Sequence, residues 1–162
     1  MGMKILFMGG YRDGDEPVYV SAGAYHQGMP LKMCTDHTID WCKLHLVDGD
    51  DGYVGLALNF AGSTSDKKSD LYNGKAAYLA GTNKVKLDAS NENDTSDTYP
   101  YLSTLTFLAG QELYIDTNGL LSNVTPATPP VTAGSATVAR VAEVGSVLGG
   151  ITTYLVVNML PS

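Results

Sequence analysis

Alternating polar and apolar positions are clearest near the middle of the chain. Between residues 84 and 88, the apolar Val85 and Leu87 alternate with charged side chains. Successive side chains of a β-strand point to opposite faces, so this pattern predicts a strand with one buried face. An apolar run over 76–80 precedes it, and residues 81–83, Gly-Thr-Asn, lie between the two. We expect the two runs to form a hairpin.

Short apolar runs separated by turn residues extend over most of the chain. They cover residues 5–8, 17–21, 31–34, 41–47, 53–60, 102–108, 111–116, 120–124, 136–144 and 152–159. A strong hairpin signal is Thr117-Asn118-Gly119, because Asn and Gly tolerate positive φ. The best helix candidate, 69–79, has Gly74 in its middle. We therefore predict an all-β fold of small barrel or sandwich units joined by long polar loops, with at most one or two short helices.

A polar loop, AGSTSDKKS, divides the chain after the first five apolar runs. It predicts an N-terminal β lobe over residues 1–60, a linker over 61–75 and a C-terminal β-barrel lobe over 76–162. A faint repeat crosses this division, because residues 28–36 and 110–118 share the pattern G-x-x-L-x-[MI]-x-T-[DN]. Either two related β units or chance similarity in a Gly- and Thr-rich sequence explains it.

Composition and charge narrow the possible partners. The chain of 162 residues is rich in glycine, is only 17% charged and has a net charge of −7. Its Lys and Arg residues are scattered, whereas phosphate binding needs clustered cations, so we expect neither nucleic acid nor a membrane as partner. Two cysteines do not form a disulfide framework, and the N-terminus does not read as a secretory signal. We expect synthesis in a reducing cytoplasm.

One stretch, CTDHTIDWCKLH, carries the residue types of a zinc or thiol site: Cys34, His37, Cys42 and His45. Four zinc ligands must converge at ~2.0–2.3 Å, whereas strand side chains three residues apart point to opposite faces. A reactive thiol needs its pKa lowered by a helix N-terminus or a neighbouring cation, and no helix start is expected beside either cysteine. We therefore predict no metal, cofactor or catalytic residues and no enzyme activity. A zinc protein, a thiol enzyme and a cross-strand disulfide stay open as alternatives.

Four segments in the second half of the chain carry a family resemblance. They are Gly74-Lys-Ala-Ala-Tyr-Leu-Ala, the run LAGQELYIDTNGLLS from Leu108, Ala139-Arg-Val-Ala-Glu-Val-Gly and Tyr154-Leu-Val-Val-Asn-Met-Leu. Together, over residues 74–160, they resemble the small β-barrel decoration proteins (cement or head-stabilising proteins) of tailed bacteriophage capsids. Residues 1–60 match less clearly.

The resemblance implies a structural protein of the virion. It would be made in the bacterial cytoplasm, bind the major capsid protein on the outside of the shell as a trimer or dimer, and stabilise contacts between capsomers. Residues 1–20 are expected to be a shell-contacting arm or edge strand. The interface residues we predict are Ile5, Phe7, Tyr11, Val18, Tyr19, Trp41, Tyr99 and Tyr101.

Two other binding functions stay open. A carbohydrate-binding or host-attachment module would use Trp41 with Tyr99 and Tyr101, an expected exposed pair, as stacking platforms. A tail or baseplate component would share the architecture of a decoration protein.

Overall fold

The computed structural model describes residues 2–17, 27–33, 44–46, 53–58, 75–89, 98–116, 118–125 and 137–160. In these ranges the chain is all-β, as predicted, and contains no helix. It follows that no described segment is a helix able to cross a membrane. The strands are β1 (Met3–Met8), β2 (Tyr11–Pro17), β3 (Pro30–Met33), β4 (Leu44–Leu46), β5 (Tyr53–Ala57), β6 (Lys75–Ala80), β7 (Asn83–Asp88), β8 (Glu112–Ile115), β9 (Leu121–Ser122), β10 (Ala139–Val144), β11 (Val147–Leu148), β12 (Ile151–Thr152) and β13 (Tyr154–Met159).

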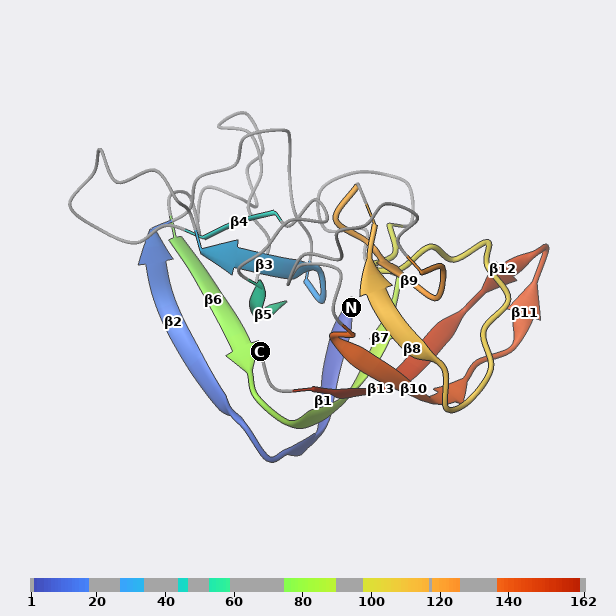
Figure 1. Ribbon diagram of the computed structural model, residues 1–162, viewed down its shortest axis with the longest axis horizontal. Helices are drawn as coiled ribbons and strands as arrows, with labels where there is room; N and C mark the ends of the chain where they lie inside the picture. The colour runs from blue at the N-terminus through green and yellow to red at the C-terminus, as the bar shows by residue number, and fades with distance from the viewer. Residues whose placement is uncertain are drawn as a thin grey trace.

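The strands form two open sheets and a projecting hairpin (Figure 1). The six-stranded sheet has the order β1-β7-β13-β10-β8-β9, and the five-stranded sheet has the order β2-β6-β5-β3-β4. The hairpin consists of β11 and β12. The described strands do not close into a barrel. One hydrophobic cluster contains residues of both sheets, for example Leu56 and Leu79 from the five-stranded sheet with Leu87 and Leu155 from the six-stranded sheet.

A long two-stranded ribbon joins the two sheets. Strand β1 pairs with β7 and strand β2 pairs with β6, and both pairs are antiparallel. The pairing continues from Met3 opposite Leu87 to Pro17 opposite Lys75. The ribbon bends where residues 9–10 lie beside residues 81–82, as the lower part of Figure 1 shows. The predicted hairpin of residues 76–80 with 84–88 is therefore wrong. These two runs are successive parts of one bent strand, and each pairs in a different sheet.

The bend depends on close backbone contact and on one buried amide. The backbone N–H of Gly10 donates to Oδ1 of Asn83 (3.1 Å), and Nδ2 of Asn83 donates to the carbonyl of Ala80 (2.8 Å) and, more weakly, to that of Gly81 (3.3 Å). A Cβ atom on Gly10 would overlap the Ala80 carbonyl oxygen. Gly81 has φ +80°, which L side chains rarely adopt. The sheet corner therefore needs glycine on both strands.

The two sheets repeat the same strand order. The strands of the five-stranded sheet can be numbered along the chain, with β2 as the first and β6 as the fifth. Their order across the sheet is then first, fifth, fourth, second, third, which is β2-β6-β5-β3-β4. The order β7-β13-β10-β8-β9 is the same arrangement with β7 as its first strand. Only β1, at the edge, and the β11–β12 hairpin, between the fourth and fifth strands, are additional. Every corresponding pair of strands is antiparallel.

Hydrogen bonds at the aligned sequence motifs confirm the relation between the two units. Gly28 and Gly110 have φ angles of +89° and +90°. The N–H of Gly28 donates to the carbonyl of Ala57 (2.8 Å), and that of Gly110 donates to the carbonyl of Val141 (2.7 Å). The return bonds, from Ala57 to Met29 and from Val141 to Gln111, are equivalent as well. The faint repeat therefore marks a duplicated five-stranded unit rather than chance similarity.

Three other expectations concern the predicted strand 102–108, the helix candidate 69–79 and the linker 61–75. The predicted strand over 102–108 is an irregular segment with a turn, in which Leu105 N–H donates to the Leu102 carbonyl (3.1 Å). The described part of the helix candidate 69–79, from Lys75 on, lies in β6. The expected linker 61–75 lies outside the described residues except for Lys75. Each sheet takes strands from both sides of that linker, since β1 pairs with β7 and β5 pairs with β6.

Candidate interaction surface

The Cys- and His-rich stretch lies largely outside the described residues. Cys34, His37 and Cys42 fall outside them, and His45 is described only as backbone of β4, opposite Lys32. In the described ranges no group of His, Cys, Asp and Glu side chains could hold a metal ion. The zinc and thiol alternatives therefore stay predictions.

The expected exposed pair of tyrosines belongs to the protein interior. Tyr101 is 1% exposed, and its hydroxyl donates to the carbonyl of Thr152 (2.8 Å). Its ring makes edge-to-face contacts with Tyr99 and Phe107, at centroid distances of 5.4 and 5.9 Å. Burial raises the pKa of the Tyr101 hydroxyl far above its usual range. Tyr101 therefore cannot act as an exposed stacking platform in the folded protein, and the prediction of an exposed pair is wrong.

Strand β1 carries apolar side chains into solvent at the edge of the six-stranded sheet. Phe7 is 66% exposed, and its neighbours Leu6 and Met8 are about half exposed. Met3 is buried in the core and Ile5 packs partly against it. The alternation ends at an irregularity between Ile5 and Phe7, where the register with β7 shifts by one residue. Of the predicted interface residues, Phe7 is thus exposed on an edge strand and Ile5 is half-buried.

The remaining predicted interface residues are not placed by the structure. Tyr11 begins β2, where only its backbone is described. Val18, Tyr19 and Trp41 lie outside the described residues. Whether these four side chains share a surface with Phe7 stays a prediction.

The β11–β12 hairpin has a firmly bonded base. At Thr152, the N–H donates to the carbonyl of Ser103 (2.8 Å) and the hydroxyl donates to that of Leu105 (3.2 Å). At Thr153, both the N–H (3.0 Å) and the hydroxyl (2.8 Å) donate to the carbonyl of Ser146. Together with the Tyr101 hydrogen bond, these contacts fix the hairpin against the core.

The far end of the same hairpin is apolar and exposed. Val147 is 58% exposed and Leu148 is 66% exposed, while Gly149 and Gly150 form the turn with φ angles of +58° and +78°. Figure 1 shows the hairpin extending beyond the sheet. Single exposed apolar residues are ordinary, but neighbouring ones on a fixed projection are typical of a contact surface.

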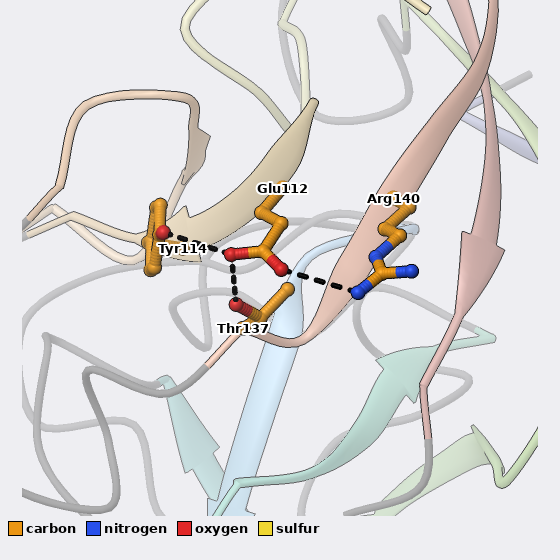
Figure 2. A network of polar contacts seen from close by, with 4 residues as sticks. All are labelled: Glu112, Tyr114, Thr137 and Arg140. Atoms are coloured by element: carbon orange, nitrogen blue, oxygen red, sulfur yellow. Dashed lines mark hydrogen bonds and ion pairs between the residues drawn. The ribbon is translucent and has the colours of Figure 1, made fainter. Parts of the chain in front are cut away.

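A polar network covers the outward face of β8 and β10 (Figure 2). Glu112 accepts hydrogen bonds from the hydroxyls of Tyr114 (3.1 Å) and Thr137 (3.0 Å) and pairs with Nη2 of Arg140 (3.2 Å). Hydrogen bonds from Thr137 first, then Tyr114 and Arg140, hold the pKa of Glu112 below its usual value. The network ties the segment before β10 to β8 and pairs the charge of Arg140 with that of Glu112.

A second polar chain crosses the neighbouring strands. The Lys86 ammonium lies 4.5 Å from the ring centroid of Tyr154, whose hydroxyl donates to Oε1 of Glu143 (2.8 Å). The Tyr154 ring lies against Gly145, where any Cβ atom would collide with it. The hydrogen bond to Glu143 raises the pKa of the Tyr154 hydroxyl.

No protein-family model and no curated protein sequence matches the chain. The surface must therefore be interpreted from its own residues. Sequence reasoning selected Phe7 but missed Leu6, Met8, Val147 and Leu148. The Gly149-Gly150 pair between apolar residues was a hairpin signal that could have located the last two.

Proposed function

We propose that the protein is a structural component of a virion that binds the outer surface of a tailed-phage capsid and stabilises contacts between capsomers. It acts by binding rather than by catalysis, its partner is the major capsid protein, and it works as a trimer or dimer on the virion exterior. The family resemblance of residues 74–160 suggested this role.

The observation that carries the proposal is the fixed hairpin with an apolar end. A protein that reinforces a shell must transmit force through a rigid contact. The β11–β12 hairpin meets this requirement, because its base is hydrogen-bonded to the core while Val147 and Leu148 remain exposed. A preorganised contact element loses little conformational entropy on binding. Many such weak contacts on one shell reinforce one another through avidity.

The carbohydrate-binding alternative has lost part of its basis. Tyr101 is buried in the core and Tyr99 packs against it. Of the proposed stacking residues, only Trp41 is left, and it lies outside the described residues. A tail or baseplate component would use the same kind of exposed apolar contact, and the assay below distinguishes it.

Co-sedimentation with undecorated shells of a phage that encodes this chain tests the proposal. We expect the protein to pellet with the shells, to saturate them at a fixed ratio and to raise their disruption temperature. Val147→Ser with Leu148→Ser should weaken binding by about tenfold, since these residues supply the apolar contact. Leu108→Ser is the matched control, because Leu108 is 63% exposed but lies outside the hairpin.

The result that would overturn the proposal is a protein that fails to bind shells but co-purifies with isolated tails. Point substitutions are needed for this test. Deleting residues 1–16 would not serve, because it would remove β1, almost all of β2 and the buried Met3.

A further inference from the structure

Lysine side chains gather on the outward face of β1 and β7. In the register of these strands, Lys4 lies opposite Lys86 and Phe7 lies opposite Lys84. Lys84 and Lys86 are two residues apart, so they share one face of β7, and Val85 and Leu87 on the other face are fully buried. The four outward residues, Lys4, Phe7, Lys84 and Lys86, are called the lysine face below.

The charges of Lys4 and Lys84 are not compensated by ion pairs within the described part of the chain. Arg140, on the same sheet, pairs with Glu112, whereas no carboxylate of the described residues forms an ion pair with Lys4 or Lys84. On the neighbouring strand β13, the residue opposite Lys84 is the neutral Asn158. Lys4 and Lys86 lie directly opposite each other, and like charges in that position destabilise a sheet. Three of the ten cationic residues thus lie together in a chain of net charge −7.

One carboxylate, Asp88, lies on the same strand as two of these lysines. Asp88 follows Lys86 by two residues, and burial raises the pKa of its carboxyl, while the N-terminus and Lys86 act to lower it. Three lysines against this one carboxylate leave the face with a formal positive charge, and the exposed ring of Phe7 lies within it.

We propose that the lysine face is a docking site for an acidic segment of a partner protein, in which carboxylates meet Lys4, Lys84 and Lys86 and an apolar side chain meets Phe7. The proposal rests on the proposed function to this extent: the partner segment belongs to the outer surface of the capsid shell. Charge complementarity carries the choice of partner. The rest of the molecule is acidic and repels an anionic surface, so binding must be directed to this face.

An acidic protein segment fits the site better than nucleic acid. Duplex DNA carries a dense line of phosphates and needs an extended basic surface. The lysine face offers only three cations in an acidic molecule, and it includes an exposed phenylalanine. A short carboxylate-bearing segment with one apolar side chain matches both features.

The test uses the full chain with a defined probe, a short synthetic peptide that alternates glutamate and leucine. We expect amide NMR shifts confined to β1, β7 and β13, which disappear at high salt and with a glutamine-for-glutamate peptide. Lys4→Gln with Lys84→Gln should weaken binding by about tenfold. The matched control, Thr104→Glu with Asn118→Glu, changes the net charge equally at exposed positions elsewhere and should keep nearly all of the affinity. Phe7→Ser should weaken binding of the leucine-containing peptide more than of an all-glutamate peptide.

Each outcome decides between the proposals. Shifts outside β1, β7 and β13, equal loss in the two double variants, or tighter binding of a DNA duplex than of the peptide would overturn the docking site. If the peptide binds the lysine face but the wild-type protein ignores shells, the proposed function fails and the docking site stands. If shells bind and Lys4→Gln with Lys84→Gln still binds fully, the function stands and the docking site is wrong.

Discussion

Replacing Asn83 by alanine tests whether the sheet corner depends on one side chain. Asn83 is 1% exposed, and its amide joins the two halves of the bent ribbon. Its oxygen accepts from Gly10, which is 73 residues away in sequence, and its nitrogen donates to Ala80 and Gly81. Alanine keeps the backbone conformation accessible but removes all of these bonds. The perturbation is therefore confined to the amide.

The expected cost follows from the groups that alanine would leave without partners. A net hydrogen bond contributes about 0.5–1.5 kcal/mol, and leaving a buried donor or acceptor unsatisfied costs ~1–3 kcal/mol. The Ala80 carbonyl bond is fully buried, while the bonds of Gly10 and Gly81 are partly buried and can be replaced in part by water. We expect Asn83→Ala to lower the free energy of unfolding by about 2–4 kcal/mol. This is a large share of the ~5–15 kcal/mol typical of a domain.

Urea unfolding followed by circular dichroism and by fluorescence measures this loss. The matched control is Asn158→Ala, because Asn158 is an exposed asparagine in the same sheet and should change stability by less than about 0.5 kcal/mol. Coincidence of the two signals checks that the transition is two-state. A loss below about 1 kcal/mol for Asn83→Ala, or an equal loss for Asn158→Ala, would refute the role assigned to the amide.

Three further predictions concern the core, the polar network and the repeat. Tyr101→Phe should cost about 1 kcal/mol in thermal unfolding, because a buried carbonyl of β12 loses its donor. Thr137→Val should raise the pKa of Glu112 in an NMR titration, and any stability gained from this exposed carboxylate should be present at neutral pH and lost as the pH falls through its lowered pKa. Both Gly110→Ala and Gly28→Ala should destabilise by ~1–2 kcal/mol through positive φ. In urea unfolding, Gly28→Ala should lose more free energy of unfolding than Gly110→Ala. A Cβ atom at position 28 would lie 3.1–3.3 Å from three atoms, whereas one at position 110 would meet none within 4 Å.

The all-β class and most described strands could be predicted because they depend on local pattern. Alternation placed Val85 and Leu87 inside β7 with lysines outside, and the structure confirms this. The Asn118-Gly119 turn was correctly assigned to a hairpin, since β8 pairs with β9. The Asp116 carboxylate accepts from the N–H groups of Asn118 and Leu120, which is a purely local arrangement.

The failures share a non-local cause. Residues 81–83 have the composition of a hairpin turn, but a turn sequence does not determine whether its flanking strands pair with each other. Here the Asn83 side chain accepts a hydrogen bond from Gly10, which is 73 residues earlier in the sequence. The threonine-rich segment 102–108 has strand propensity but forms a turn, and it supplies carbonyls to the hairpin at Thr152 instead of pairing in a sheet. Strand propensity depends strongly on such surroundings.

The candidate surface was predictable only in part, because exposure is a property of the assembled sheets. Tyr101 and Phe7 are both aromatic residues in apolar surroundings, yet one is in the core and the other in solvent. The exposure of Phe7 arises from the register shift after Ile5, which no spacing rule reveals. The lysine face likewise requires the pairing of β1 with β7, two segments about 80 residues apart in sequence.

The repeated strand order separates a common frame from the elements that are added to it. Two copies of a five-stranded unit account for ten strands, and only β1, β11 and β12 are additional to them. Of the seven large hydrophobic side chains exposed in the described residues, five lie on β1 and β11: Leu6, Phe7, Met8, Val147 and Leu148. A strand needed only to complete a core would bury its apolar residues, as β13 does. The exposed apolar surface thus concentrates on elements outside the repeat, as expected if the repeat supplies the rigid frame and the additions supply the contacts.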